Sequence, residues 1–101
     1  MHVWEATLRP KDNDVQRTCE WWQSMKKITG AEHFENGQAL SRMDGENSVL
    51  IIRHTFEDLA HEQKVFEAWF GTECQQIFEE QFAEYVDAPP VFHRYNVLHS
   101  Y

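Results

Sequence analysis

Long apolar runs are missing from this 101-residue sequence, and its start lacks a basic segment followed by an apolar stretch. A membrane-spanning helix needs about 20 apolar residues, and a secretory signal needs both of those segments. Basic residues are also scarce, because nine lysines and arginines stand against 17 acidic residues, and the formal charge of -8 repels polyphosphate. We therefore expect a cytoplasmic protein that binds neither membranes nor nucleic acid.

The signatures of several enzyme classes are absent as well. The sequence has no GxSxG nucleophile elbow, no phosphate-binding loop and no HExxH zinc motif, so hydrolase and nucleotide-binding functions have no support. Its two cysteines, Cys19 and Cys74, lack the CxxC spacing of redox and zinc sites. Both fall on the apolar sides of expected helices, which favours two buried thiols.

The residues that are present suffice for one hydrophobic core. Hydrophobic residues make up 42% of the chain and aromatic residues 14%, which is typical of a globular protein of this length. No internal repeat or low-complexity segment divides the sequence. We expect a single domain over residues 1–101.

The order of the expected elements indicates the fold class. The apolar pattern predicts strands and helices in the order β-α-β-β-α-β, which is the ferredoxin-like α+β plan with a four-stranded antiparallel sheet and its helices on one face. The segments are a strand over His2–Arg9, a helix from Asp12 or Asp14 to Gly30, strands on either side of Asp44–Asn47, a helical region from Asp58 that is interrupted at Gly71, and a last strand over Val91–Tyr101.

The faces of the sheet predict a partner. On the first strand, Trp4 and Leu8 share the face that should meet the helices. The third strand, Val49–Ile52, is apolar on both faces, so both sides of the sheet should be buried at its centre. Because the helices cover only one side, a second copy of the chain is the simplest cover for the other. We expect a homodimer that forms a closed barrel with a space between its two sheets.

The chain resembles the dimeric α+β barrel superfamily, and within it the antibiotic-biosynthesis monooxygenase group, which includes haem-degrading enzymes. The resemblance covers nearly the whole chain and rests on three features: the aromatic stretch Val65–Phe70, the helix restart Thr72–Cys74, and the aromatic residue Tyr101 at the end of the last strand. It implies the same fold and a dimer.

The resemblance also marks three site positions. Haem-degrading members carry an asparagine on the first strand, a tryptophan in the second helical region and a histidine about ten residues later, where this chain has Thr7, Trp69 and Glu79. Glu79 brings no imidazole to hold iron, so haem degradation is not implied. Other members oxidise phenols without a metal or cofactor, and we expect no cofactor here.

Histidines suggest a possible metal site. In the usual strand order 4-1-3-2, the start of the first strand meets the ends of its neighbours, so His2, His54 and His99 would lie at one end of the sheet. Three imidazoles on one face can hold zinc, copper or iron. Solvation, or hydrogen bonds to the backbone, is the alternative for each, and we expect no metal.

A polar group is expected on the sheet face away from the helices. Glu5, Thr7 and Arg53, with either His93 or Arg94, can project into the space between two sheets and orient a ligand there. The alternative is an ion pair between Glu5 and Arg53 with no ligand.

The leading hypothesis is a cofactor-independent, monooxygenase-like enzyme acting on a small aromatic or apolar molecule in a pocket between the sheet and the helices. Trp69, beside the break at Gly71, would stack on the substrate, although ordinary packing also explains it. Thr7 and Arg53 would orient the substrate, and His93 would take a phenolic proton. The alternatives are a non-catalytic small-molecule-binding or dimerisation module and a histidine-ligated metal enzyme.

Overall fold

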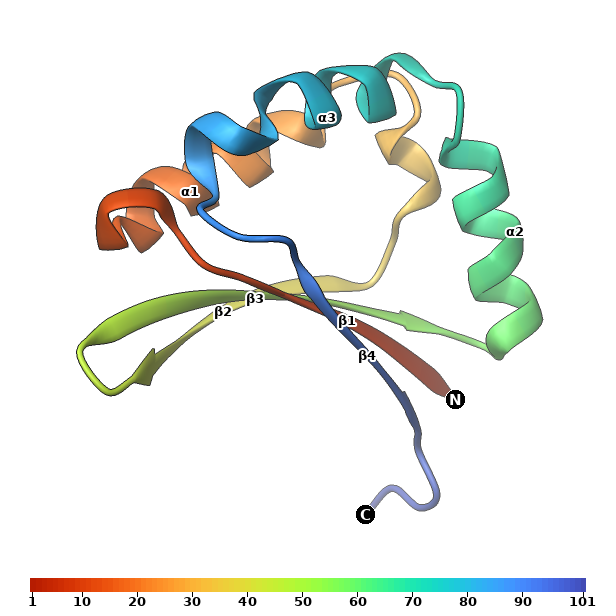
Figure 1. Ribbon diagram of the computed structural model, residues 1–101. Helices are drawn as coiled ribbons and strands as arrows, with labels where there is room; N and C mark the ends of the chain where they lie inside the picture. Colours follow the sequence, from red (N-terminus) through yellow and green to blue (C-terminus); the bar gives the residue numbers. More distant parts are fainter.

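The helices lie over one face of a single antiparallel sheet (Figure 1). The computed structural model describes all residues, 1–101. The elements are β1 (His2–Leu8), the 3-10 turn η1 (Lys11–Asn13), α1 (Val15–Met25), the 3-10 turn η2 (Ala31–His33), β2 (Gly37–Asp44), β3 (Asn47–Phe56), α2 (Leu59–Trp69), α3 (Glu73–Tyr85) and β4 (Val91–Asn96).

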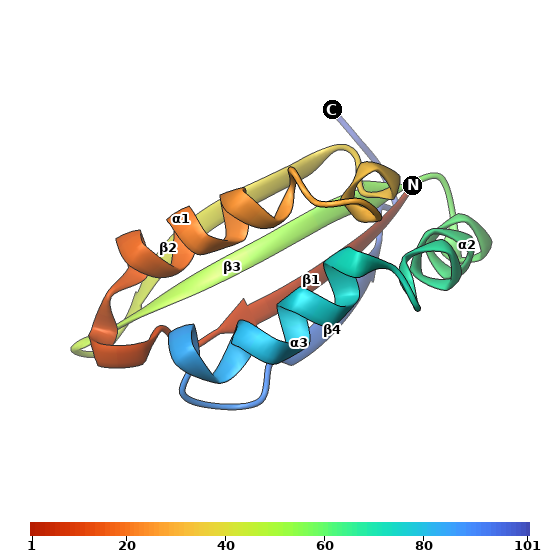
Figure 2. The ribbon, with the colours of Figure 1, turned by 90° about the horizontal axis from the view of Figure 1, so that it is seen from above.

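The strand order is β2-β3-β1-β4, with every neighbouring pair antiparallel. This is the order expected from the sequence, and it confirms the ferredoxin-like α+β plan. Seen from above, α1 and α3 run over the sheet, while α2 stands at the end of the sheet where the N-terminus lies (Figure 2).

None of the helices combines the length and the apolar composition that crossing a membrane requires.

Side-chain caps begin the helices where the sequence indicates. The Arg17 N–H donates to Asp14 Oδ1 over 3.0 Å at the start of α1, and the His61 N–H donates to Asp58 Oδ1 over 2.8 Å at the start of α2. The expected break is confirmed at Gly71, whose φ of +84° lies in the left-handed region that glycine favours. Thr72 then caps α3, so the second helical region is two helices.

The last strand is shorter than expected. It ends at Asn96, not at Tyr101, because its pairing partner β1 begins at His2, which lies opposite Asn96. One further hydrogen bond, from the Val97 N–H to the Met1 carbonyl, closes the ladder. The last residues have no neighbouring strand to pair with, and Leu98 and Tyr101 are exposed.

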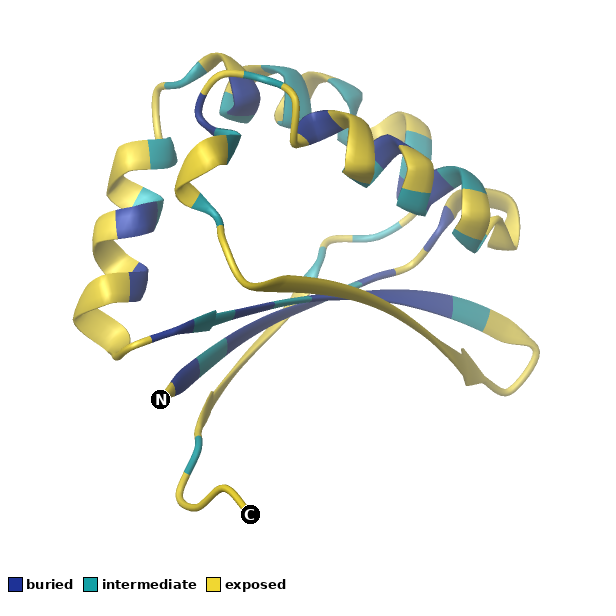
Figure 3. Cartoon of the chain, turned by 180° about the vertical axis from the view of Figure 1, so that it is seen from behind, coloured by how far each residue is buried: buried dark blue, intermediate teal, exposed yellow.

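The core lies between the sheet and the helices (Figure 3). Its buried residues include Trp4, Ala6 and Leu8 of β1 together with Leu50 and Ile52 of β3, as the alternation of the first strand predicts. On the other side, which we call the open face, Ile51 is already 8% exposed within one chain. The apolar centre of β3 is thus buried on both faces, but this burial does not by itself require a second copy.

On α2, the spacing of apolar residues in the sequence predicts a stripe made of Leu59, Phe66, Trp69 and Phe70, and the structure differs from it at the start of the helix. Leu59 at the start of α2 is 47% exposed, and Glu62 one turn later is buried. The buried residues of α2 are Glu62 and Val65, so a carboxylate lies on the inner face of this helix.

Candidate functional site

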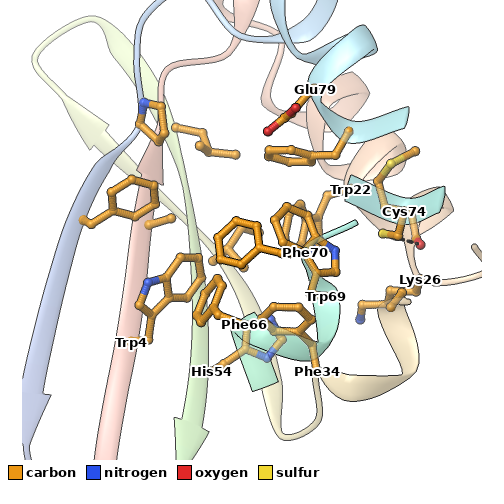
Figure 4. A pocket seen from close by; sticks show the side chains of 18 residues that line it. Trp4, Trp22, Lys26, Phe34, His54, Phe66, Trp69, Phe70, Cys74 and Glu79 are labelled. Atoms are coloured by element: carbon orange, nitrogen blue, oxygen red, sulfur yellow. Dashed lines mark hydrogen bonds between the residues drawn. The ribbon is translucent and has the colours of Figure 1, made fainter. Parts of the chain in front are cut away.

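A cavity of about 280 Å³ lies between the sheet and the helices (Figure 4). Of the 18 residues that line it, 14 are hydrophobic. The sheet contributes Trp4 and His54, while α1 and α3 contribute Trp22 and Cys74 from the opposite side. Ligand cavities are mostly apolar with a few placed polar groups, and this one has that character.

Trp69 lies in the wall of this cavity at the last turn of α2. Its ring centre is 5.9 Å from those of both Phe34 and Phe78, and both contacts are edge-on. The chain leaves the helix at the next residue, Phe70, which is 58% exposed at the rim. Trp69 therefore packs in an aromatic cluster and also presents surface to the cavity. Its position is compatible both with ordinary packing and with stacking on a ligand.

His54 supplies the buried polar group of the cavity wall. It lies on β3 opposite Trp4 and is 3% exposed. Nδ1 is 3.0 Å from the Glu35 carbonyl oxygen, and Nε2 is buried with no hydrogen-bond partner. Burial lowers the pKa of His54 below its ordinary value, the hydrogen bond to Glu35 opposes this, and the charge of Lys26 adds to the lowering. The ring is accordingly neutral at physiological pH.

The other polar lining groups are less available or less enclosed. The Cys74 thiol donates to the Met25 carbonyl over 3.6 Å. Lys26 and Glu79 also line the cavity, and both are charged residues on the helix side. Glu79, ten residues after Trp69, is thus at the cavity, as the resemblance implies for that position.

A second polar group forms on the open face. Arg53 Nη2 donates to Glu5 Oε1 over 2.7 Å, the Tyr95 hydroxyl donates to Glu5 Oε2 over 3.0 Å, and His93 Nδ1 lies 3.9 Å from the same oxygen. The hydrogen bond from Arg53 is the main cause that lowers the pKa of Glu5, and the bond to Glu5 raises the pKa of Tyr95. We call Glu5, Arg53, His93 and Tyr95 the open-face cluster.

The sheet separates the site residues expected from the sequence. Glu5, Thr7, Arg53 and His93 share the open face, as expected, since Glu5 lies opposite Arg53 and His93 in the ladder and Thr7 follows two residues later. Trp69 lies across the sheet from them, in the cavity. A single site in which Trp69 stacks on a substrate while His93 deprotonates it is therefore not formed within one chain.

Known structures share this architecture. A NIPSNAP domain protein from Burkholderia xenovorans gives a TM-score of 0.75 at 15% sequence identity, and the match covers 99% of each chain. A NIPSNAP family protein from Agrobacterium tumefaciens gives a TM-score of 0.74 at 12% identity over 94% of this chain and 90% of that one. A candidate antibiotic biosynthesis monooxygenase from Nitrosomonas europaea gives a TM-score of 0.60 at 12% identity over 98% and 100%. This chain has their fold.

No family model matches the sequence, and no curated protein matches it either. At such low identity, the likeness to the NIPSNAP and monooxygenase structures extends to the fold and not to the reaction. The structural likeness therefore confirms the fold that the sequence resemblance implied.

The three histidines considered for a metal are not brought together. His2 Nε2 is 3.0 Å from Glu62 Oε1, and His54 is engaged with the Glu35 carbonyl. His99 lies beyond the end of β4, because the last strand stops at Asn96. The structure contains no cluster of three histidine, cysteine or acidic side chains arranged to hold a metal ion.

Sequence reasoning missed two of the polar positions. His54 was considered as a metal ligand or as a histidine bonded to the backbone, as it is to Glu35, but not as a lining group of the cavity. Its alternation with Ile52 and Leu50 places it on the helix face, where the cavity is. Glu62 was not considered, although it lies three residues after Leu59 and four before Phe66, on the inward side of α2. An acidic residue spaced three or four residues from apolar residues of the same helix face is the sequence pattern that could have predicted this buried carboxylate.

Proposed function

We propose that this protein binds a small, largely apolar or aromatic molecule in the cavity between the sheet and the helices, and oxidises it with molecular oxygen as a cofactor-independent monooxygenase. The observation that carries the proposal is the cavity itself, with 14 hydrophobic residues among its 18 lining residues and aromatic rings on the sheet and helix sides. The fold shared with a candidate monooxygenase supports the reaction class.

The proposed chemistry suits an enclosed apolar site. A phenolic ring reacts with O₂ so that one oxygen atom enters the ring as a quinone carbonyl and the other leaves as water, with the substrate supplying all the electrons. In this cavity, Trp69 would stack on the ring, and the apolar walls would exclude water from the reacting molecule.

The test compares ligand binding before and after the cavity is filled. Ala31 lines the cavity, so Ala31→Phe should occupy part of it and weaken binding of 1-methoxynaphthalene at least about tenfold, which corresponds to about 1.4 kcal/mol. Ala83 is exposed on α3, so Ala83→Phe adds the same side chain outside the cavity and is the matched control. Quenching of tryptophan fluorescence provides the readout. Equal binding by the two variants would contradict the cavity as the site.

Turnover is tested separately with phenolic substrates and an oxygen electrode. We expect oxygen uptake that depends on protein and falls in Trp69→Ala. Binding without any oxygen uptake would favour the non-catalytic binding module instead.

We also propose that a second copy of the chain covers the open face. Three large side chains on that face are exposed: Leu40 at 37%, Val91 at 54% and Tyr95 at 46%. Tyr95 belongs to the open-face cluster, whose Glu5 is buried. In such a dimer, the open-face cluster would lie in the space between the two sheets. Sedimentation equilibrium should give twice the mass of one chain.

A further inference from the structure

The tautomer of His54 is fixed by its surroundings. Nδ1 lies 3.0 Å from the Glu35 carbonyl oxygen, and a carbonyl oxygen only accepts, so Nδ1 must carry the hydrogen. In a neutral ring, Nε2 then presents a lone pair. This nitrogen is buried and has no partner within the protein. His54 is thus a hydrogen-bond acceptor in the cavity wall with its acceptor unused.

The position of the ring is fixed as well. Gly37 lies opposite His54 in the ladder between β2 and β3, and a Cβ at Gly37 would be 2.5 Å from Cε1 of the imidazole. The ring therefore fills the space that a side chain at that position would take. Phe34 also packs against the imidazole, with ring centres 5.2 Å apart. Because Nε2 is shielded from solvent, a ligand would have to displace a neighbouring side chain such as Phe34 to reach it.

We propose that the cavity selects aromatic ligands that carry a hydroxyl group, with Nε2 of His54 accepting the hydrogen of that hydroxyl. This inference deepens the proposed function and rests on it, because it names the residue that recognises the hydroxyl group of the proposed phenolic substrates. Burial keeps the imidazole neutral and so keeps the acceptor available. The sequence predicts His93 beside the substrate, but His93 is on the open face. Within one chain, His54 is the histidine that lines the aromatic cavity.

The test uses two probes that differ at the oxygen alone, 1-naphthol and 1-methoxynaphthalene. A donor in the cavity, such as an indole N–H, can bind either oxygen, whereas only the hydroxyl can donate to Nε2. We expect the protein to bind 1-naphthol at least about tenfold more tightly. His54→Phe should bind the two probes equally, and His54→Gln should restore part of the preference because its amide oxygen is also an acceptor.

Lys26→Met provides the control. Lys26 is the cationic lining residue, so a preference that came from binding the naphtholate anion would be lost in this variant and kept in His54→Phe. A preference that follows His54 and not Lys26 supports the inference. Equal affinity of the unaltered protein for both probes would overturn it while leaving the cavity function intact.

A second measurement does not depend on the folding of any variant. The ¹⁵N chemical shift of His54 Nε2 in the unaltered protein should move upfield with 1-naphthol and stay in place with 1-methoxynaphthalene. An unmoved shift with both bound probes would overturn the role of His54. If neither probe binds, the proposed function fails first, and the inference fails with it.

Discussion

At the scale of single residues, the titration of His54 connects the cavity to the stability of the fold. Burial lowers its pKa below the ordinary 6.5, and the facing groups are the Glu35 carbonyl and Lys26. As the pH falls below 6.5, the unfolded chain binds a proton at His54 and the folded chain does not, so the free energy of unfolding decreases. The difference in unfolding free energy between the protein and His54→Gln should therefore shrink as the pH is lowered from 7 through this range. Urea unfolding at several pH values measures it, and parallel curves would contradict it.

Glu62 links α2 to β1 and β4 through polar contacts. It is 1% exposed, and its carboxylate accepts hydrogen bonds from Arg94 Nε over 2.9 Å and lies 3.0 Å from His2 Nε2. Glu62→Gln removes the charge that both partners face, and we expect a loss of about 1–3 kcal/mol in the free energy of unfolding. Glu67→Gln, on the exposed side of the same helix, is the matched control and should change stability little. Equal effects in the two variants would show that the buried contacts add nothing.

At the scale of elements, β2 approaches the His54 ring closely at Gly37, and the contact between these two residues can be tested by substitution. Gly37→Ala forces the imidazole to move, and overpacking of this kind costs about 1–3 kcal/mol. In the double variant Gly37→Ala/His54→Ala, the added methyl group meets space left by the ring, so the combined loss should be smaller than the sum of the single losses by more than about 0.5 kcal/mol. Denaturant unfolding of the four proteins gives this coupling energy. Additive losses would mean that the ring and Gly37 do not meet.

Elements were predictable wherever a local signal defined them. Asp58 and Gly71 mark a helix start and a helix break through their own backbone chemistry, and both were located from the sequence. The end of β4 was not predictable in this way, because it depends on where β1 begins, and β1 pairs with β4 from the opposite end of the sequence. The face of His54 could be inferred from local alternation, but the cavity beside it depends on how distant segments pack. For the same reason the sequence predicted the fold, yet grouped Trp69 and His93 into one site although the sheet lies between them.

At the scale of the whole molecule, one face of the sheet is covered by helices and the other is not (Figure 3). The cytoplasmic location stays a prediction, since composition alone supports it. The uncovered face has a mixed character. In the open-face cluster, Glu5 accepts hydrogen bonds from Arg53 and Tyr95, while Arg53 Nε is buried without a partner. Outside the cluster, Leu40 and Val91 leave apolar surface exposed. Surface of this composition matches the polar and apolar mixture found at protein interfaces.

The last prediction concerns β2, whose two faces give a matched pair of substitutions. Leu40 lies opposite Ile51 on the open face, and Met43 lies opposite Ser48 on the helix side of the sheet and is 61% exposed. Leu40→Arg would bury a charge in a dimer made through the open face, whereas Met43→Arg places the same charge on surface that such a dimer leaves free. We expect light scattering to give the mass of one chain for Leu40→Arg and of two for Met43→Arg. Because the cavity is on the other side of the sheet, Leu40→Arg should still bind 1-methoxynaphthalene, so assembly and ligand binding can be lost separately. A Leu40→Arg protein that remains dimeric would place the contact between copies elsewhere.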